Sequence, residues 1–239
     1  MDTLVSAEWL KQHIDDPDMI VLDCTVVTMP DEDDPRGISN VSGRPDYELG
    51  HIPNAGFAEL KGELCKTTGP VEFDLLSPEQ FCEVMGRLGV GDDSRVVLYD
   101  TSYTGWAARV WWMLRWVGFD QAAILDGGLA AWTSSGNQLS LDPVSRPARK
   151  LTPKPRPELI ADHDEVLAAI GDDAVVLIDT LPEAFYRGEM SIYPRAGHIT
   201  GAVNIDGLGL LDNRGYLLPQ QELEAMHELD RNARIITYC

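Results

Sequence analysis

The stretch Arg234-Ile235-Ile236-Thr237-Tyr238-Cys239 decides the fold of this chain, because an earlier stretch, Arg95-Val96-Val97-Leu98-Tyr99-Asp100, repeats its pattern. In both, an Arg precedes three strand-forming residues and a Tyr, and the sixth position changes from a carboxylate in the first copy to a thiol in the second. Such a run predicts a buried strand that delivers its last side chain to the carboxyl end of a sheet. Open α/β sheets place their ligand sites at this end. A thiol there can act as a nucleophile and a carboxylate cannot do the same job, so Cys239 is the candidate nucleophile.

The repetition extends outward from these two stretches. Residues 174–179 form an apolar run that ends in Asp, as residues 18–23 do. The stretch Gly197-His198-Ile199 corresponds to Gly50-His51-Ile52. Leu218-Pro219-Gln220 likewise corresponds to Ser77-Pro78-Glu79. Because these landmarks recur in one order, the chain contains two homologous α/β units rather than the short repeats of a solenoid.

A Pro-rich connector separates the two units. Five prolines and several basic residues fall within residues 139–158, with no periodic pattern, which favours an extended, semi-rigid segment. The expected division is a first domain at residues 1–138, a linker at 139–158 and a second domain at 159–239. The fold class is α/β, with a mainly parallel sheet flanked by helices in each domain.

Local patterns place the individual elements. Ser6 and Ser77 are expected to cap helices, the second of which carries Pro78 at its first position. Residues 29–45 are acidic and contain Pro and Gly, which predicts a loop. Further helices are expected at residues 105–117, 129–132 and 162–170, and strands at residues 18–23, 96–99, 122–125 and 174–179.

Composition excludes several classes of partner. The formal charge of -20 disfavours nucleic acid and anionic membranes, and neither a membrane-spanning run nor a signal pattern is present. We therefore expect a cytoplasmic protein. The four cysteines show no CxxC pairing and no metal-ligand spacing with the histidines, so we expect free thiols and neither a metal nor a cofactor. The same negative charge repels small anions, so an anion site needs nearby cations.

A family resemblance rests on the two Gly-His-Ile turns, on Arg109-Val110-Trp111-Trp112-Met113, on residues 126–132 and on the terminal Thr237-Tyr238-Cys239. In these stretches the chain resembles tandem-domain rhodanese-type sulfurtransferases. This family contains thiosulfate sulfurtransferase and 3-mercaptopyruvate sulfurtransferase. The resemblance implies a catalytically silent first domain and a second domain with the active cysteine, a division that Asp100 and Cys239 fit. The sequence stops at that cysteine, so we expect the natural protein to continue and the second domain to be incomplete here.

The resemblance implies a double-displacement reaction. The Cys239 thiolate would take the outer sulfur of a small anionic donor, thiosulfate or 3-mercaptopyruvate, and pass it from a persulfide to cyanide or to a thiol, including a protein thiol such as thioredoxin. Two alternatives stay open at this point. Related folds use a strand-end cysteine in phosphatases and arsenate reductases, and a non-enzymatic sulfur-carrier or regulatory module would keep the persulfide without turnover.

Two arginines are candidates for binding the donor. Arg195 precedes His198 by three residues, where the family carries a substrate-contacting Arg, and its planar fork suits a carboxylate or sulfonate. Arg187 is the second candidate, although this chain departs from the family pattern nearby. At the position of the family's usual substrate Arg it has Phe185, and at the position of a further family Arg it has Leu181. Either Arg187 takes over the anion contact, or donor specificity differs from that of the two named enzymes.

The histidines and strand-end acids are expected to have structural tasks. His51 and His198 occupy matching turns, and only one of the two domains carries a nucleophile, so we expect both rings to tie loop backbone together rather than to act as bases. Asp23 and Asp179 are expected to accept loop N–H groups.

Overall fold

The computed structural model of this chain describes residues 1–69, 71–226, 229–230 and 232–239. It divides into two compact units, the first formed by Met1–Met29 and Asn40–Pro157 and the second by Pro30–Ser39 and Glu158–Cys239. None of the described helices is long and apolar enough to cross a bilayer.

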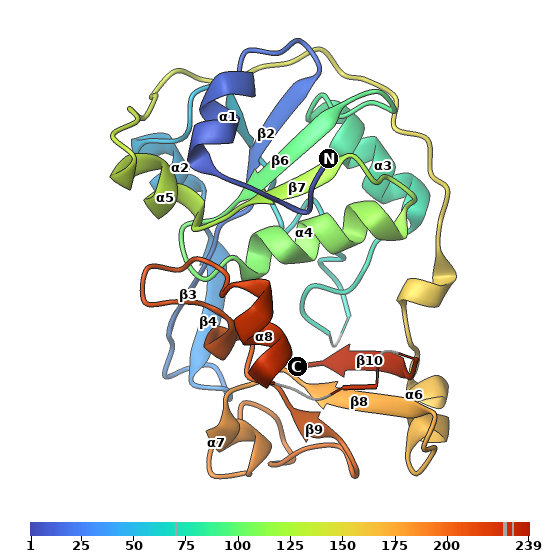
Figure 1. The fold of residues 1–239 in the computed structure, drawn as a ribbon. Helices are drawn as coiled ribbons and strands as arrows, with labels where there is room; N and C mark the ends of the chain where they lie inside the picture. Colours follow the sequence, from blue (N-terminus) through green and yellow to red (C-terminus); the bar gives the residue numbers. More distant parts are fainter. Residues whose placement is uncertain (70, 227–228, 231) are drawn as a thin grey trace. The chain divides into compact units, whose positions relative to one another are not determined.

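A five-stranded parallel sheet forms the first unit (Figure 1), in the order β1-β7-β6-β2-β5. Its strands are β1 (Leu4–Val5), β2 (Met19–Asp23), β5 (Ala55–Phe57), β6 (Arg95–Tyr99) and β7 (Ala122–Leu125). Every residue of β2 and β7 is buried, as a strand covered on both faces requires. The predicted mainly parallel α/β architecture is confirmed.

Five α-helices belong to the first unit, and α4 packs against β6 and β7 while α5 packs against β7 and α1. They are α1 (Ala7–His13), α2 (Arg44–Leu49), α3 (Pro78–Arg87), α4 (Gly105–Trp116) and α5 (Gly128–Ser134), followed by the 3₁₀ helix η1 (Pro157–Leu159). Both predicted caps are confirmed. The Ser6 hydroxyl accepts the N–H of Trp9, and Ser77 forms a reciprocal capping box with Gln80, which satisfies N–H groups that the first helical turn leaves free.

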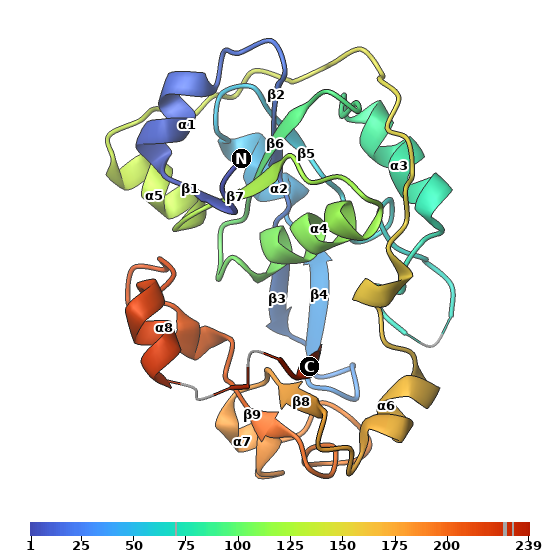
Figure 2. The ribbon, with the colours of Figure 1, turned by 45° about the vertical axis from the view of Figure 1, so that its right-hand side comes forward.

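The prediction of a loop at residues 29–45 is wrong. The chain there contains β3 (Val26–Pro30) and β4 (Ile38–Ser42), which pair in a separate two-stranded sheet and lie side by side in Figure 2. Side-chain bonds hold this sheet, since Thr28 donates to Asn40 and Asn40 donates to Glu72. These strands are only partly buried, and strands held by polar contacts lack the apolar periodicity on which the prediction relied.

The second unit repeats the architecture on a smaller scale. Its parallel sheet has the order β10-β8-β9, with β8 (Val175–Asp179), β9 (Val203–Asn204) and β10 (Arg234–Tyr238). The helices are α6 (His163–Ala169), α7 (Glu183–Tyr186), the 3₁₀ helix η2 (Leu208–Leu210) and α8 (Gln220–Met226). The C-terminus lies at the tip of the β10 arrow (Figure 1), so the sheet presents Cys239 at its carboxyl end.

Candidate active site

Strand β10 carries Cys239 just beyond its last paired residue. Tyr238 pairs with Asp179 in the parallel register of β8, and both the N–H and the hydroxyl of Thr180 donate to the Tyr238 carbonyl at 2.9 and 3.0 Å. The strand is therefore fixed up to the residue before the cysteine. Cys239, the last residue of the given sequence, is exposed.

A buried network lies directly behind this strand end. The Ile199 N–H donates to the Tyr238 hydroxyl at 2.9 Å, and the carboxylate of Asp179, which is 2% exposed, acts on the same phenol. Burial, together with the negative charge of Asp179, raises the pKa of Tyr238 to about 12, so the phenol stays protonated. Asp179 also accepts the Leu181 N–H at 2.9 Å, which confirms the predicted task of this strand-end acid.

The first unit contains the same network. The Ile52 N–H donates to the Tyr99 hydroxyl at 3.3 Å, the charge of Asp23 acts on that phenol, and Asp23 accepts the Thr25 N–H at 2.9 Å. Burial raises the pKa of Asp23, and the bonds from Thr25 and Tyr99 oppose that rise. Because the network occurs in both units, it supports the strand end rather than the chemistry of one cysteine.

Both histidines tie loop backbone together, which confirms their predicted structural task. The His51 ring stacks on Tyr47 at 4.1 Å and its nitrogens bond the carbonyls of Tyr47 and Asp142 at 2.9 and 3.1 Å. The His198 ring stacks on Tyr186 at 3.7 Å and bonds its carbonyl at 2.7 Å. Both ring nitrogens of His51 and the Nδ1 of His198 are therefore engaged with backbone carbonyls.

The loop after β6 surrounds the carboxylate of Asp100. One carboxylate oxygen accepts the N–H groups of Ser102 and Thr104 at 2.9 and 3.1 Å, and the other accepts those of Trp106 and Ala107 at 3.1 and 3.0 Å. The last two N–H groups belong to the first turn of α4, where the helix dipole also favours a negative charge. Asp100 is 2% exposed, so this cradle is filled by the chain's own anion.

A glycine lets the backbone close around Asp100 from the other side. Gly128 has a φ of +53°, and a Cβ there would lie 2.4 Å from the Asp100 carbonyl oxygen. That carbonyl accepts the Leu129 N–H at 3.1 Å. The Gly127-Gly128 pair therefore serves the close approach of α5 to the strand end.

The two candidate arginines differ in their surroundings. Arg187 forms an ion pair with Glu183 one helical turn away, which neutralises much of its charge. Arg195 is exposed, and no ion pair or hydrogen bond joins it to the residues that the structure describes.

Tyr193 lies two residues before Arg195, and its hydroxyl donates to the Cys239 carbonyl at 3.2 Å. The sequence analysis did not single out Tyr193, because no local pattern indicates this long-range bond.

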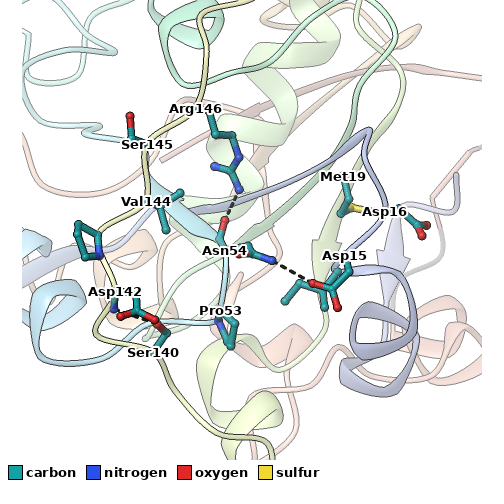
Figure 3. A pocket seen from close by; sticks show the side chains of 12 residues that line it. Asp15, Asp16, Met19, Pro53, Asn54, Ser140, Asp142, Val144, Ser145 and Arg146 are labelled. Atoms are coloured by element: carbon teal, nitrogen blue, oxygen red, sulfur yellow. Dashed lines mark hydrogen bonds between the residues drawn. The ribbon is translucent and has the colours of Figure 1, made fainter.

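A pocket of about 430 Å³ lies elsewhere, at the amino ends of β2 and β5 in the first unit. Arg146 donates there to the Asn54 carbonyl, and the Asn54 amide donates to Asp15 at 3.2 Å (Figure 3). Burial lowers the pKa of Arg146. Its lining contains neither Cys239 nor a candidate arginine, so this pocket is not the candidate active site.

The fold and the strand end define a class of protein: a duplicated α/β chain with a buried carboxylate at one strand end and an exposed thiol at its counterpart. The model of the Rhodanese-like domain family matches residues 6–135 and 162–239. The chain belongs to this family and is a rhodanese-family sulfurtransferase.

Individual relatives agree with this membership. The chain is 34% identical to the 3-mercaptopyruvate sulfurtransferase of Escherichia coli (strain K12) over 93% of its own length and 77% of the relative's. It is 28% identical to the thiosulfate sulfurtransferase of Rattus norvegicus over 99% and 80% of the two lengths, and 30% identical to the sulfur carrier protein TtuD of Thermus thermophilus over 100% and 82%. The crystal structure of SseA from Escherichia coli superposes with a TM-score of 0.87 at 32% identity, covering 100% of this chain and 88% of that one.

Proposed function

We propose that this chain moves a sulfane sulfur from thiosulfate or 3-mercaptopyruvate to a thiol or cyanide through a persulfide on Cys239. The observation that carries the proposal is the contrast between matched strand ends. In the first unit, Asp100 is buried and each of its oxygens already accepts two N–H groups. In the second unit, the corresponding residue at the strand end is the thiol of Cys239. The first unit is therefore assigned a silent, supporting role.

The reaction proceeds in two displacements. The Cys239 thiolate attacks the outer sulfur of the donor, a new S–S bond forms, and the donor's own bond to that sulfur breaks. The electron pair of the broken bond leaves with sulfite in the case of thiosulfate, and with the enolate of pyruvate, which then takes up a proton, in the case of 3-mercaptopyruvate. An acceptor thiolate or cyanide then attacks the outer sulfur of the persulfide and releases the Cys239 thiolate. Because a free thiol has a pKa of about 8.5, the nucleophile needs N–H groups or cations nearby at neutral pH. The loop around Asp100 illustrates how backbone N–H groups hold a strand-end anion.

Arg195 is the proposed contact for the anionic end of the donor. The chain carries 39 acidic residues against 19 Lys and Arg, so a local cation is needed to hold an anion. Arg195 is exposed and lies two residues from Tyr193, whose hydroxyl bonds the carbonyl of Cys239. Two residues span at most about 7 Å along the chain, so Arg195 belongs to the segment that contacts the Cys239 backbone. Arg187 is the weaker candidate, because Glu183 already pairs with it.

The relatives support the reaction class and leave the donor open. Enzymes named for 3-mercaptopyruvate and for thiosulfate resemble this chain at 34% and 28% identity. The relative named as a sulfur carrier, at 30% identity, favours one second candidate. In that case Cys239 would accept a sulfur and hand it to a partner protein, without turning over small acceptors.

Steady-state assays with both donors test the proposal. Each donor is supplied with cyanide or a small dithiol, and the wild type is compared with Cys239→Ser, Arg195→Gln and the matched control Arg187→Gln. Cys239→Ser should lose all turnover. A hydrogen bond between charged groups contributes roughly 1.5–3 kcal/mol, so Arg195→Gln should lower kcat/KM about 10- to 100-fold, and Arg187→Gln should change it much less. Full activity in Cys239→Ser would refute the mechanism, while sulfur uptake without turnover would favour the carrier.

A further inference from the structure

Tyr193 holds the backbone of Cys239 through a side-chain hydrogen bond. Its hydroxyl donates to the Cys239 carbonyl at 3.2 Å, while Thr180 holds the preceding carbonyl, that of Tyr238, at 2.9 and 3.0 Å. The two successive carbonyls are thus bonded to different segments of the same unit. Fixing both of them restricts the rotation of the peptide that joins Tyr238 to Cys239.

The backbone of Tyr193 is itself restrained by its own loop. The Ser191 hydroxyl donates to the Tyr193 carbonyl at 2.7 Å, and the Tyr193 N–H donates to the same Ser191 oxygen at 3.1 Å. A short turn closed by a side chain in this way is a preferred local structure for Ser. The phenol therefore reaches Cys239 from a restrained base.

The charges around the phenol keep it a hydrogen-bond donor. Burial raises the pKa of Tyr193, Cys239 and Asp179 raise it further, and Arg36 opposes them. Arg36 belongs to the Pro30–Ser39 segment of the same unit and is engaged in a two-pronged bond with Asp34 at 3.0 and 2.9 Å. The hydroxyl thus carries its proton at the neutral pH at which a thiolate reacts.

We propose that Tyr193 is a positioning residue for Cys239, which fixes the cysteine backbone so that the thiol faces the donor held by Arg195. The inference rests on the proposed persulfide chemistry. Because Arg195 lies two residues along the chain from Tyr193, the same bond ties the anion-binding segment to the nucleophile. The bond between Tyr193 and Cys239 joins residues 46 positions apart, so neither element would hold this geometry alone.

The test compares Tyr193→Phe with the wild type and with Tyr216→Phe in the full protein. Tyr216 is a matched control, because it lies in the same unit and its ring contacts Arg214, while no hydrogen bond joins its hydroxyl to the described residues. Donor is mixed rapidly with enzyme, the reaction is quenched at set times, and the sulfur added to the Cys239 peptide is quantified by mass spectrometry. Steady-state kcat and KM, the alkylation rate with neutral iodoacetamide and the melting temperature are measured on the same samples.

Removing the hydrogen bond from the Tyr193 hydroxyl to the main-chain oxygen of Cys239 should slow sulfur loading and alkylation about threefold to tenfold. We expect kcat to fall by a similar factor, KM to stay within about twofold, and the melting temperature to be unchanged because Tyr193 is half exposed. Tyr216→Phe should match the wild type in every measurement. Equal loading rates in Tyr193→Phe and wild type would overturn the inference and leave the proposed function intact. Absence of added sulfur in the wild type would overturn both.

Discussion

Replacing Asp100 with Asn should destabilise the first unit far more than its small change in volume suggests. The Asp100 carboxylate accepts four backbone N–H groups, two on each oxygen, at 2.9–3.1 Å. An Asn side chain offers one oxygen and one NH₂ group, which only donates. Whichever way the amide is oriented, two of the four N–H groups lose their acceptor.

The expected cost follows from the burial of this site. Asp100 is 2% exposed, so water cannot easily replace the missing acceptor. A buried donor left without a partner costs about 1–3 kcal/mol, which gives about 2–5 kcal/mol for two donors after some relaxation of the loop. For a unit of this size, that corresponds to a fall in melting temperature of roughly 5–15 °C.

Urea unfolding followed by tryptophan fluorescence measures this change selectively. All six tryptophans lie within the part of the chain that forms the first unit, so the signal reports that unit and not the one with Cys239. Asp46→Asn is the matched control, because it makes the same chemical change at an exposed position of α2 and should alter stability by a few tenths of a kcal/mol. An unfolding free energy of Asp100→Asn within about 0.5 kcal/mol of wild type would refute the idea of a filled cradle.

Three further predictions concern the cysteines, the histidines and acid stability. Only Cys239 of the four cysteines is exposed, so iodoacetamide at pH 8 should alkylate it alone in the folded protein and all four after denaturation; peptide mapping that finds a second modified cysteine in the folded state would contradict this burial. His51→Ala should lower unfolding stability by about 2–4 kcal/mol because two bonds and a buried stack are lost, whereas His198→Ala should cost about 1 kcal/mol and retain sulfur transfer; a loss of about 100-fold or more in kcat would instead indicate a general base. The bond from Arg95 lowers the pKa of Asp18 below its ordinary 3.8, so its stabilisation is complete above that pH and is lost as pH falls through the lowered pKa. Arg95→Gln should therefore destabilise by up to about 1 kcal/mol at pH 7, given the exposure of the pair, and by less at pH 3; urea midpoints that differ equally at both pH values would count against the assignment.

The elements that the sequence predicted best are those with buried, repeated patterns. The apolar run in β6 and its counterpart in β10 predicted two parallel sheets with a Tyr and a polar residue at the strand ends. The two sheets have the same register, since Tyr99 pairs with Asp23 and Tyr238 pairs with Asp179. The matching Gly-His-Ile turns predicted a shared structural task, and the stacked Tyr–His pairs explain it. Burial on both faces leaves a continuous apolar run, and duplication provides a second copy for comparison.

The elements that the sequence did not predict depend on contacts between distant residues. Strands β3 and β4 are only partly buried and are held by side-chain bonds such as that of Thr28 with Asn40, so they carry no apolar period. The bond from Tyr193 to Cys239 joins residues 46 positions apart. The sequence around Asp100 likewise did not predict that four backbone N–H groups would surround its carboxylate. The roles of Cys239 and Arg195 remain predictions, because their chemistry depends on a bound donor.

The mass of the Cys239 peptide after brief exposure to donor tests the central claim most directly. The protein is treated with thiosulfate or with 3-mercaptopyruvate, separated from excess donor, digested without reductant and analysed by mass spectrometry. The account predicts a gain of one sulfur atom on the peptide that contains Cys239, lost again on addition of cyanide. A peptide of unchanged mass with both donors, or sulfur found on one of the three buried cysteines instead, would contradict it.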